Sequence, residues 1–376
     1  MNKKVYQVSV IGGGLAGLTL AIQLADAGYS VILFEKNKYP FHKVCGEYIS
    51  MESWDFLVRL GLPIDRLEPS RISRLQISSP SGKLLKHTLG QGGFGISRYL
   101  LDSNLADLAR EKDVTLMEDC RVTDIRFESE KFVINTSQGS YTSEICAAAW
   151  GKKSNLDTKL GRSFTKTKEE RNYVGIKYHV SLDFPDDLIE LHNFKNGYCG
   201  ISKIEGEKYC LCYLTDAENL KQHTGNIREM EREVLMKNPI LKDYFSRAKF
   251  LFEEPLAISQ VRIGYKSAVE QHILMLGDTA GNIAPLSGNG MSIAMRSSFV
   301  LSRLIKEYFG KKIDRATLEG KYERFWKKQF AKRVRFSARL QKLLKNTRLT
   351  NLAISCLKAL PFVRNAVVKS THGQPF

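Results

Sequence analysis

The sequence predicts an α/β fold, in which a mainly parallel sheet covered by helices is joined to a second, mixed or antiparallel sheet and to C-terminal helices. Three observations lead to this prediction. A strand, a glycine-rich turn, a helix and another strand open the chain; a stretch rich in Tyr, Val, Ile and Cys occupies the middle; and an apolar strand returns at 273–276. Alternating strands and helices favour a parallel sheet, whereas consecutive strands favour an antiparallel one.

The first segment has the pattern of a nucleotide-binding turn. The strand 8–11 runs into Gly12, Gly14 and Gly17, and a helix is predicted over 18–27. Gly12 permits a tight turn, Gly14 lets the backbone approach a pyrophosphate, and Gly17 lets the helix pack closely on the sheet. The pyrophosphate would then lie at the positive end of the helix dipole.

An acidic residue ends the second strand. Glu35 follows Gly12 by 23 residues, close to the roughly 20-residue spacing at which an acid at a strand tip binds ribose hydroxyls. A carboxylate at this point would repel a 2′-phosphate. The nucleotide that is held tightly is therefore expected to be FAD or NAD rather than NADP.

The length of 376 residues predicts two or three domains. We expect a discontinuous, Rossmann-like nucleotide-binding domain, a substrate domain and a basic helical region, with the boundaries 1–70, 95–160 and 265–310; 71–94 and 161–264; and 311–376. Between these boundaries the local patterns predict helices over 51–60, 100–109, 227–236 and 292–304, paired strands over 75–79 and 83–89 followed by a glycine-rich link, and strands over 174–182, 189–194 and 209–214.

The net charge of +17 is concentrated at the C-terminal end. From Arg303 onward there are 19 Lys and Arg residues against four carboxylates, and no Asp or Glu follows Glu323. The simplest interpretation is a solvated basic face. An anionic membrane surface comes second. Nucleic acid comes last, because no nucleic-acid-binding motif accompanies the charge.

Apolar residues recur at helical spacing in this basic region and predict helices packed on the body of the protein. The residues expected to face inward are Trp326, Phe330, Val334, Leu340, Leu343, Leu344, Leu349, Leu352, Cys356 and Leu360. The residues expected to face solvent are Lys327, Lys328, Lys332, Arg333, Arg335, Arg339 and Lys342.

Seven cysteines, an odd number without metal-type spacing, indicate reduced thiols and predict no metal site. Residues 1–4 lead directly into a strand, so no signal peptide is expected. No apolar run approaches the roughly 20 residues that span a bilayer. We expect a cytoplasmic protein, located at the inner membrane face if its basic region binds lipid.

A second glycine-containing turn follows the apolar strand 273–276. Gly277-Asp278 puts an acid at the strand tip, where it could bind a polyol hydroxyl. Further along, Gly288 and Gly290 precede a helix whose free N–H groups could face an anionic ring edge.

These two turns together resemble those of the glutathione-reductase-type flavoproteins, which include class A flavin monooxygenases, geranylgeranyl reductases and flavin-dependent halogenases. The resemblance covers nearly the whole chain and implies FAD as cofactor. In it, the first turn and Glu35 match the ADP-binding turn, Arg98 resembles the arginine near the flavin phosphates, and Gly277-Asp278 resembles the ribityl-binding pair. The candidate cofactor-binding residues are Gly12, Gly14, Leu15, Ala16, Gly17, Glu35, Lys36, Lys43, Cys45, Gly46, Arg98, Val122, Gly277, Asp278, Gly288, Asn289, Gly290 and Met291.

The stretch 39–47 looks most like the geranylgeranyl-reductase branch, where a Cys-Gly pair lies over the flavin. A lone cysteine is most often a small packing residue. The resemblance makes Cys45 an active-site candidate, as a proton donor or as a redox partner. Pro285 and Tyr198 are the other two catalytic candidates.

The chain departs from several of these families. The halogenase Trp-x-Trp-x-Ile-Pro signature is absent, so halogenation is not expected. Residues 197–201 replace the aromatic substrate motif of archaeal geranylgeranyl reductases. Trp150-Gly151 stands where the monooxygenases carry Asp-Gly, and there is no second Gly-x-Gly-x-x-Gly. NAD(P)H is therefore expected as a transient reductant, unless the electrons come from another donor.

No Ser/His/Asp triad or paired-carboxylate motif stands out, so the flavin is expected to carry out the difficult step. The first hypothesis is a monooxygenase that hydroxylates a hydrophobic aromatic, polyketide or isoprenoid substrate through a flavin C4a-hydroperoxide. The alternative is a reductase that saturates double bonds of an isoprenoid or lipid. A basic nucleic-acid-binding protein is the third hypothesis.

Overall fold

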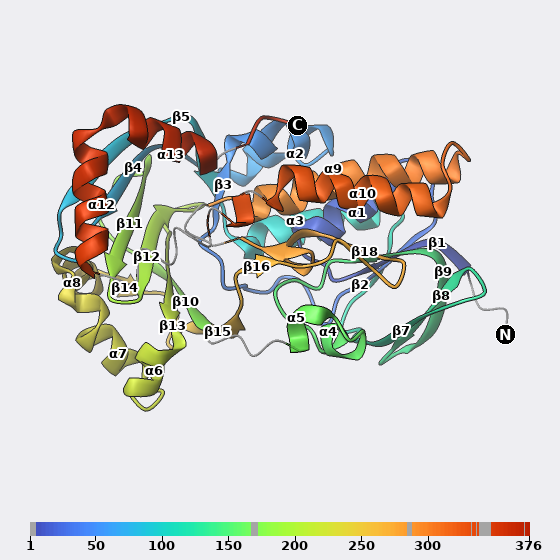
Figure 1. The fold of residues 1–376 in the computed structure, drawn as a ribbon, viewed down its shortest axis with the longest axis horizontal. Coiled ribbons are helices and arrows are strands. Elements are labelled where there is room, and N and C mark those ends of the chain that lie inside the picture. The colour runs from blue at the N-terminus through green and yellow to red at the C-terminus, as the bar shows by residue number, and fades with distance from the viewer. Residues whose placement is uncertain are drawn as a thin grey trace.

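The computed structural model of the chain describes residues 5–166, 172–283, 288–331, 333–335, 337, 347–371 and 373–376. Two large sheets lie side by side in Figure 1, sheet A towards the N-terminus and sheet B at the opposite end of the molecule. The predicted fold class is confirmed, because sheet A is built around parallel strands and sheet B is almost entirely antiparallel.

Sheet A has the strand order β17-β18-β9-β1-β2-β6, with β8 and β7 added beside β9. The strands are β1 (Val5–Ile11), β2 (Val31–Phe34), β6 (Thr115–Met117), β7 (Val122–Glu128), β8 (Lys131–Thr136), β9 (Gly139–Ala148), β17 (Val269–Glu270) and β18 (Ile273–Met275). The parallel strands β18, β9, β1, β2 and β6 end at the same edge of the sheet. Ligands of open parallel sheets bind beyond this edge.

Three helices lie beside sheet A, and α1 packs against both α3 and α9. They are α1 (Leu15–Ala25), α3 (Arg98–Glu111) and α9 (Gly290–Phe309), and α10 (Arg315–Gln329) packs on α9. The helix predicted over 18–27 is α1, and Gly28, which follows its end, has a φ of +84° that a glycine adopts without strain. The helix predicted over 51–60 consists of η1 (Met51–Ser53) and α2 (Trp54–Arg59).

Sheet B has the strand order β14-β10-β13-β12-β11-β4-β5-β3, with β15 also paired to β10. The strands are β3 (Tyr48–Ser50), β4 (Ser70–Ser78), β5 (Leu84–Gly95), β10 (Tyr173–Ser181), β11 (Leu188–Phe194), β12 (Gly197–Lys203), β13 (Tyr209–Asp216), β14 (Lys249–Phe250) and β15 (Leu256–Val261). The only parallel pair among them is β4 with β11. β3 belongs to sheet B, although its residues lie within the segment 1–70 that we assigned to the nucleotide-binding domain. The domain boundaries stay a prediction.

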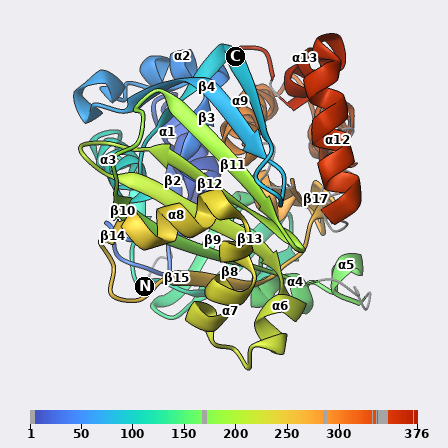
Figure 2. The ribbon, with the colours of Figure 1, turned by 90° about the vertical axis from the view of Figure 1, so that its left-hand side faces the viewer.

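Side chains alternate across sheet B, so that it has two different faces. On β10, Val174, Ile176 and Tyr178 pack in a hydrophobic core with α7 (Ile227–Glu233) and α8 (Pro239–Arg247). Figure 2 shows α6 (Ala217–Gln222), α7 and α8 lying in front of the strands. The intervening residues of β10 point to the opposite face, towards sheet A. Helices therefore cover one face of sheet B, and the other face is available for a binding site.

Two sequence predictions for sheet B are wrong. The glycine-rich segment after residue 89 is not a link, because β5 continues through Gly95. Its glycines serve close approaches: a Cβ on Gly95 would lie 1.8 Å from the oxygen of Lys203, and Gly92 has a φ of +67°. The strand β12 was not predicted, because Gly197 and Gly200 weaken the strand signal.

The smaller elements connect the two sheets. They are η2 (Ile64–Leu67), α4 (Asn155–Lys159), α5 (Ser163–Lys166), η3 (Leu235–Lys237), β16 (Gly264–Tyr265), η4 (Gly277–Thr279) and β19 (Gly281–Asn282). All seven cysteines are free thiols. None of the helices in the described part of the chain is long and apolar enough to cross a bilayer.

The basic C-terminal region contains α12 (Thr347–Ala359) and α13 (Pro361–Thr371), which stand beside sheet B in Figures 1 and 2. Trp326, Phe330 and Val334 are buried as predicted. The prediction is wrong for four residues on α12 and directly after it, because Leu349, Leu352, Cys356 and Leu360 are exposed. The inward face is offset by one residue: Thr350 and Ile354 are buried instead. Both faces of α12 carry apolar residues, so spacing alone did not identify the buried one.

The other residues of this prediction are only partly accounted for. Of the predicted outward cations, Lys327, Lys328 and Arg335 are exposed and Arg333 is half-buried. The remaining predicted residues lie outside the described part of the chain: Lys332, Arg339, Leu340, Lys342, Leu343 and Leu344.

Candidate functional site

A cavity of about 1250 Å³ lies between the two sheets and α12. Ligand pockets commonly measure about 300–1000 Å³, so this cavity has room for a large cofactor together with a substrate. Its lining divides into two parts. One part, which we call the cradle, is Gly12, Gly14, Leu15, Ala16, Glu35, Lys43, Arg98, Gly277 and Asp278. The other, the apolar half, is Leu75, Ile77, Leu89, Ile189, Leu191, Leu214, Ile258, Val261, Ile354 and Leu357.

The first glycine turn of the cradle has no space for side chains at two positions. Gly12 has a φ of +106°, and a Cβ added there would lie 2.5 Å from the oxygen of Ala149. A Cβ on Gly17 would lie 2.0 Å from the oxygen of Gly12. Gly14 differs, because its nearest neighbours would be the cationic nitrogens of Arg98 and Lys43, at 3.7 and 3.8 Å. The backbone at Gly14 is therefore open towards two positive charges.

A buried carboxylate holds these two cations in place. Asp102 accepts hydrogen bonds from Nε and Nη2 of Arg98, each at 2.7 Å, and from Nζ of Lys43 at 2.8 Å. Burial lowers the pKa of Arg98, but the charge of Asp102 outweighs it and raises the pKa above its ordinary value. No side chain caps the N-terminus of α1 beside them. Two fixed cations and an uncapped helix end favour a phosphate group.

Glu35 supports the turn from the next strand. Its Oε2 accepts a hydrogen bond from the N–H of Gly13 at 2.8 Å, and its Oε1 accepts one from the N–H of Asn37 at 3.1 Å. The Tyr39 hydroxyl donates to the oxygen of Gly13. Glu35 is thus fixed on the cavity wall, where part of its hydrogen-bonding capacity is already used by the turn itself.

The second predicted turn reaches the same cavity from the other end of the chain. Gly277, with a φ of +54°, begins η4 directly after β18, and Gly277 and Asp278 line the cavity. Gly288, Gly290 and Met291, at the start of α9, also line it. Pro285 lies outside the described residues. The structure therefore brings the two glycine turns together around one cavity.

Asn289, between Gly288 and Gly290, is fully buried. Neither its amide nitrogen nor its amide oxygen has a hydrogen-bond partner among the described residues. A buried polar group without a partner costs about 1–3 kcal/mol. Its neighbours Gly288 and Gly290 line the cavity, but Asn289 itself does not.

Two buried cations support η4 from behind. Arg162 donates to Asp157 Oδ1 at 2.8 Å and to the oxygen of Thr279 at 2.9 Å. Nζ of Lys266 donates to the oxygens of Lys152 and Asp278, at 3.0 and 3.2 Å. Burial lowers the pKa of Lys266 to about 8. The strand tip that carries Asp278 is therefore held by a lysine that titrates close to neutral pH.

Cys45 lies on the loop that follows β2, with its side chain partly exposed to the cavity. Its thiol contacts Sδ of Met291 at 3.7 Å, and the N–H of Glu47 donates to Sγ at 3.5 Å. The oxygen of Cys45 accepts a hydrogen bond from the Cys210 thiol of β13 at 3.3 Å. The cysteine is thus held between the start of α9 and sheet B.

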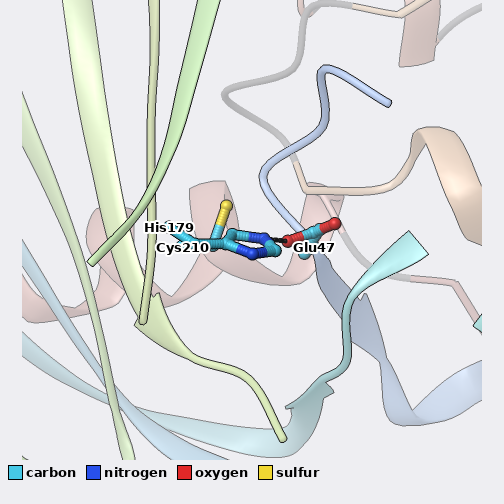
Figure 3. A group of neighbouring side chains, drawn as sticks. All are labelled: Glu47, His179 and Cys210. Atoms are coloured by element: carbon cyan, nitrogen blue, oxygen red, sulfur yellow. Dashed lines mark hydrogen bonds and ion pairs between the residues drawn. The ribbon is translucent and has the colours of Figure 1, made fainter. Parts of the chain in front are cut away.

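A buried ionic cluster fastens this loop to the cavity-facing side of β10. Glu47 has a φ of +55° and no exposed surface, and it accepts hydrogen bonds from Lys177 Nζ, from His179 Nε2 at 2.7 Å and from the N–H of Arg98 at 2.7 Å. Burial raises the pKa of Glu47, but the His179 hydrogen bond and the Lys177 charge outweigh it and hold the pKa below its ordinary value. Figure 3 shows the Glu47 carboxylate facing the imidazole.

Glu47, His179 and Cys210 also have metal-type ligand atoms within 4.8 Å of one another. The ammonium group of Lys177, however, already lies against the Glu47 carboxylate. The ammonium group of Lys177 therefore balances the negative charge of Glu47. We interpret the cluster as the contact that holds the loop carrying Cys45 against sheet B.

Most predicted site residues meet on the cavity wall. They are Gly12, Gly14, Leu15, Ala16, Glu35, Lys36, Lys43, Cys45, Gly46, Arg98, Val122, Tyr198, Gly277, Asp278, Gly288, Gly290 and Met291. Gly17 and Asn289 are not part of the wall. Tyr198 lies on β12 at the apolar half, where burial raises the pKa of its hydroxyl far above the ordinary value, so it stays protonated.

Sequence reasoning missed Tyr48, Glu47 and Asp102. Tyr48 lines the cavity and its ring covers Gly93, where a Cβ would lie 2.3 Å from the ring. Asp102 occurs four residues after Arg98 on α3, a spacing that could have signalled the pair. Glu47 gave no such signal, because its partners lie on β10, about 130 residues further along the chain.

Comparison with known proteins agrees with this geometry. A family model described as an NAD(P)-binding Rossmann-like domain matches residues 10–46. "Conditioned medium factor receptor 1" of Dictyostelium discoideum is 24% identical over 355 residues, which cover 88% of this chain and 69% of that protein. The digeranylgeranylglycerophospholipid reductase of Methanococcus vannielii is 24% identical over 374 residues, with 91% of this chain and 88% of that protein covered.

Solved structures share the fold. A geranylgeranyl bacteriochlorophyll reductase-like protein from Thermoplasma acidophilum matches with a TM-score of 0.79 at 18% identity, covering 95% of this chain and 92% of that one. A variant of the halogenase PltM in complex with FAD matches with a TM-score of 0.75 at 16% identity, covering 92% and 78%. The arrangement of a parallel sheet and a second sheet is thus the fold of these proteins, one of which was solved with FAD.

Proposed function

We propose that this chain is an FAD-dependent oxidoreductase, and more specifically a reductase that saturates carbon–carbon double bonds of a long apolar lipid or isoprenoid. The observation that carries this proposal is the pair of sulfur atoms of Cys45 and Met291. They lie 3.7 Å apart on the wall of a cavity whose other half is apolar. The relatives that carry reductase names support the same reaction class.

The residues of the cradle fit FAD. Arg98, Lys43 and the open backbone at Gly14 would hold the pyrophosphate, while Glu35 and Asp278 would hold hydroxyl groups. Reduced FAD, when bound, supplies a hydride to the substrate. NADH or NADPH, binding only transiently, is the proposed source of the electrons.

Saturating a double bond requires a proton as well as a hydride. The Cys45 thiol holds a proton at the cavity wall and can transfer it to the second carbon. The thiolate left behind would accept the hydrogen bond that the N–H of Glu47 donates to Sγ at 3.5 Å. Because Cys45 is partly exposed, water can return the proton.

The sulfur pair favours reduction over oxygen insertion. Hydroxylation, the first hypothesis from the sequence, would require a peroxide-type oxidant beside Cys45 and Met291. Thiolates and thioethers are oxidised by such species. A hydride donor does not oxidise a thiol or a thioether. The side chains at this point of the cavity wall are therefore more compatible with a reductase than with a monooxygenase.

The test is anaerobic turnover. Enzyme containing FAD is reduced with dithionite and mixed with a geranylgeranyl lipid in the absence of oxygen. The masses of the products are then measured by mass spectrometry. We expect the lipid to gain pairs of hydrogen atoms. Cys45→Ala should lower the rate about 100-fold or more, as for loss of a general acid, while FAD content and its rate of reduction by dithionite stay the same.

Cys212→Ala is the matched control, since Cys212 lines the same cavity but has no assigned role. It should change the rate less than about threefold. A product that gains one oxygen atom, formed only in air, would replace the reductase by the monooxygenase. Equal turnover rates of Cys45→Ala and Cys212→Ala would show that Cys45 is not the proton donor.

A further inference from the structure

Exposed hydrophobic side chains gather on α12 and at the start of α13. Nine large hydrophobic side chains are exposed among the described residues, and four of them are Leu349, Leu352, Leu360 and Phe362. Leu352 and Phe362 are the most exposed of the nine, at 61% and 76%. Isolated exposed hydrophobic residues are ordinary, but four of them within residues 349–362, where α12 ends and α13 begins, mark an interaction site. We call these four residues the outer patch.

The opposite face of α12 lines the cavity. Thr350, Ala353, Ile354 and Leu357 recur at helical spacing and belong to the cavity wall, as does Val367 of α13. A single helix therefore separates the apolar half of the cavity from the outer patch. Anything that covers the outer patch lies within one helix diameter, about 10 Å, of the cavity.

The C-terminal segment that carries the patch has charges of one sign. From Arg324 to the last residue there are 13 Lys and Arg residues and no carboxylate side chain. Arg348 and Lys358 are exposed on α12 itself. An apolar strip flanked by cations on a helix is the pattern of segments that lie in the interface of an anionic membrane.

The described residues on both sides of α12 and α13 are anchored. Trp326 and Phe330 are buried before this segment. After it, the Phe376 ring packs against Phe56 and Phe299, with centroids 5.1 and 5.9 Å away, and its oxygen accepts a hydrogen bond from Arg59. The outer patch is thus presented by a segment that is fastened to the nucleotide-binding part of the protein.

We propose that the outer patch docks on an anionic lipid bilayer and that substrate enters the cavity from that bilayer beneath α12, the second part resting on the proposed function. The apolar side chains would lie among the upper acyl chains, and the lysines and arginines would contact the headgroups. A nucleic acid suits the charge but not the apolar strip, because its backbone contacts are ionic. A lipid surface satisfies both features.

The test is flotation of the full FAD-containing chain with vesicles. Vesicles of phosphatidylcholine with about 30% phosphatidylglycerol are compared with pure phosphatidylcholine. The wild type should float with the anionic vesicles and about tenfold less with the neutral ones. The double variant Leu352→Asp/Phe362→Asp should lose about tenfold or more of the binding to anionic vesicles.

The matched control is Val58→Asp/Leu251→Asp, which introduces the same charges at two exposed hydrophobic residues elsewhere, 49% and 41% exposed. It should float like the wild type. Equal flotation with neutral and anionic vesicles, an equal loss in both double variants, or displacement of the protein from vesicles by equimolar duplex DNA would each overturn the docking.

Turnover separates the two proposals. A variant at the outer patch should reduce a detergent-dispersed short polyprenyl alcohol at the wild-type rate, but should lose activity on a lipid embedded in anionic vesicles. If the wild type floats and reduces neither substrate, the proposed reaction is wrong and the docking stands. If patch variants keep full activity on embedded lipid, entry from the bilayer is wrong.

Discussion

The two halves of the cavity recognise their ligands in different ways. The cradle uses backbone at Gly12 and Gly14, supported by close packing at Gly17, together with cations fixed by Asp102. The apolar half uses side chains from β4, β5, β11, β13, β15 and α12. Phosphate binding needs close backbone approach, which only glycine permits, whereas an apolar ligand needs only a matching shape. The cradle should therefore tolerate almost no substitution, and the apolar half should tolerate many.

The loop 43–47 connects these halves. It carries Lys43 of the cradle and Cys45, and the buried Glu47 ties it to Lys177 and His179 of sheet B. The position of this loop, and with it the distance between the two halves of the cavity, thus depends on an ionic cluster whose residues belong to neither half. The following substitutions test this division, beginning with the largest expected effect.

Gly17→Ala should abolish FAD binding. The added Cβ would lie 2.0 Å from the oxygen of Gly12 and 3.2 Å from Cγ1 of Val10, so the backbone of the turn itself would have to move. We expect colourless protein and a loss of more than about 3 kcal/mol in the free energy of unfolding, in the range of severe overpacking. Absorbance at the flavin band and thermal melting measure both. Gly320→Ala in α10, where a Cβ meets nothing within 4 Å, should keep its FAD and be slightly more stable.

Glu47→Gln should cost about 3 kcal/mol of stability, because Lys177 would be left as an uncompensated buried charge. The matched control is Glu231→Gln. Glu231 is equally buried, but burial raises its pKa and it accepts hydrogen bonds from Tyr178 and Tyr213, which a neutral amide oxygen can also accept. We expect a loss of about 1 kcal/mol there. Equal losses in urea unfolding would contradict the anchoring role of Glu47.

The Glu47 contribution should also depend on pH. Its pKa in the folded protein lies below the ordinary value of 4.5, so its stabilising effect is complete above that pH and is lost as the pH falls through the lowered pKa. The stability difference between wild type and Glu47→Gln should therefore be constant at neutral pH and shrink in acid. A difference that grows in acid would contradict the ionic pairing.

Leu191→Ala should weaken substrate binding without changing FAD binding. Leu191 lines the apolar half, and loss of its three outer carbons should cost about 1–3 kcal/mol of substrate affinity, or about tenfold or more. Leu220→Ala is the control, since Leu220 packs on the helix-covered face of sheet B. Titration with the geranylgeranyl lipid and with FAD checks both. A comparable loss of FAD affinity would mean that the two halves are not independent.

Lys266 should give FAD binding a pH dependence of a few fold. Burial lowers its pKa to about 8, so the lysine loses its positive charge as the pH rises from 7 to 9. Because FAD carries two phosphates, its affinity should fall over that interval. Lys266→Met should flatten the profile, whereas Lys159→Met, which removes an exposed cation of the same cavity wall, should keep the slope. An unchanged slope in Lys266→Met would contradict this assignment.

The residues of the cradle could be identified from the sequence because each is marked by its immediate neighbours along the chain. Gly12, Gly14, Gly17, Gly277 and Asp278 each act through their own backbone or through a strand end, so spacing along the chain carries the signal. Even so, only the folded chain shows that both turns line one cavity.

The rest depends on contacts between distant segments. Glu47 meets β10 only after both sheets form, and the strand β12 was missed because its glycines serve packing. On α12 the spacing of Leu349 and Leu352 suggested a buried face, yet Thr350 and Ile354 face inward. A helix that is apolar on both sides does not reveal from its sequence which side meets the protein and which meets a partner.

The most direct test of the central claim is the titration of FAD-free protein with FAD and with FMN. The claim is that two glycine turns, from opposite ends of the chain, hold one dinucleotide beside an apolar chamber. We predict one FAD bound per chain, and binding of FMN about 100-fold weaker or more, because FMN lacks the ADP portion that the first turn and its cations would hold. Protein that stays colourless with excess FAD, or that binds FMN equally well, would contradict the account.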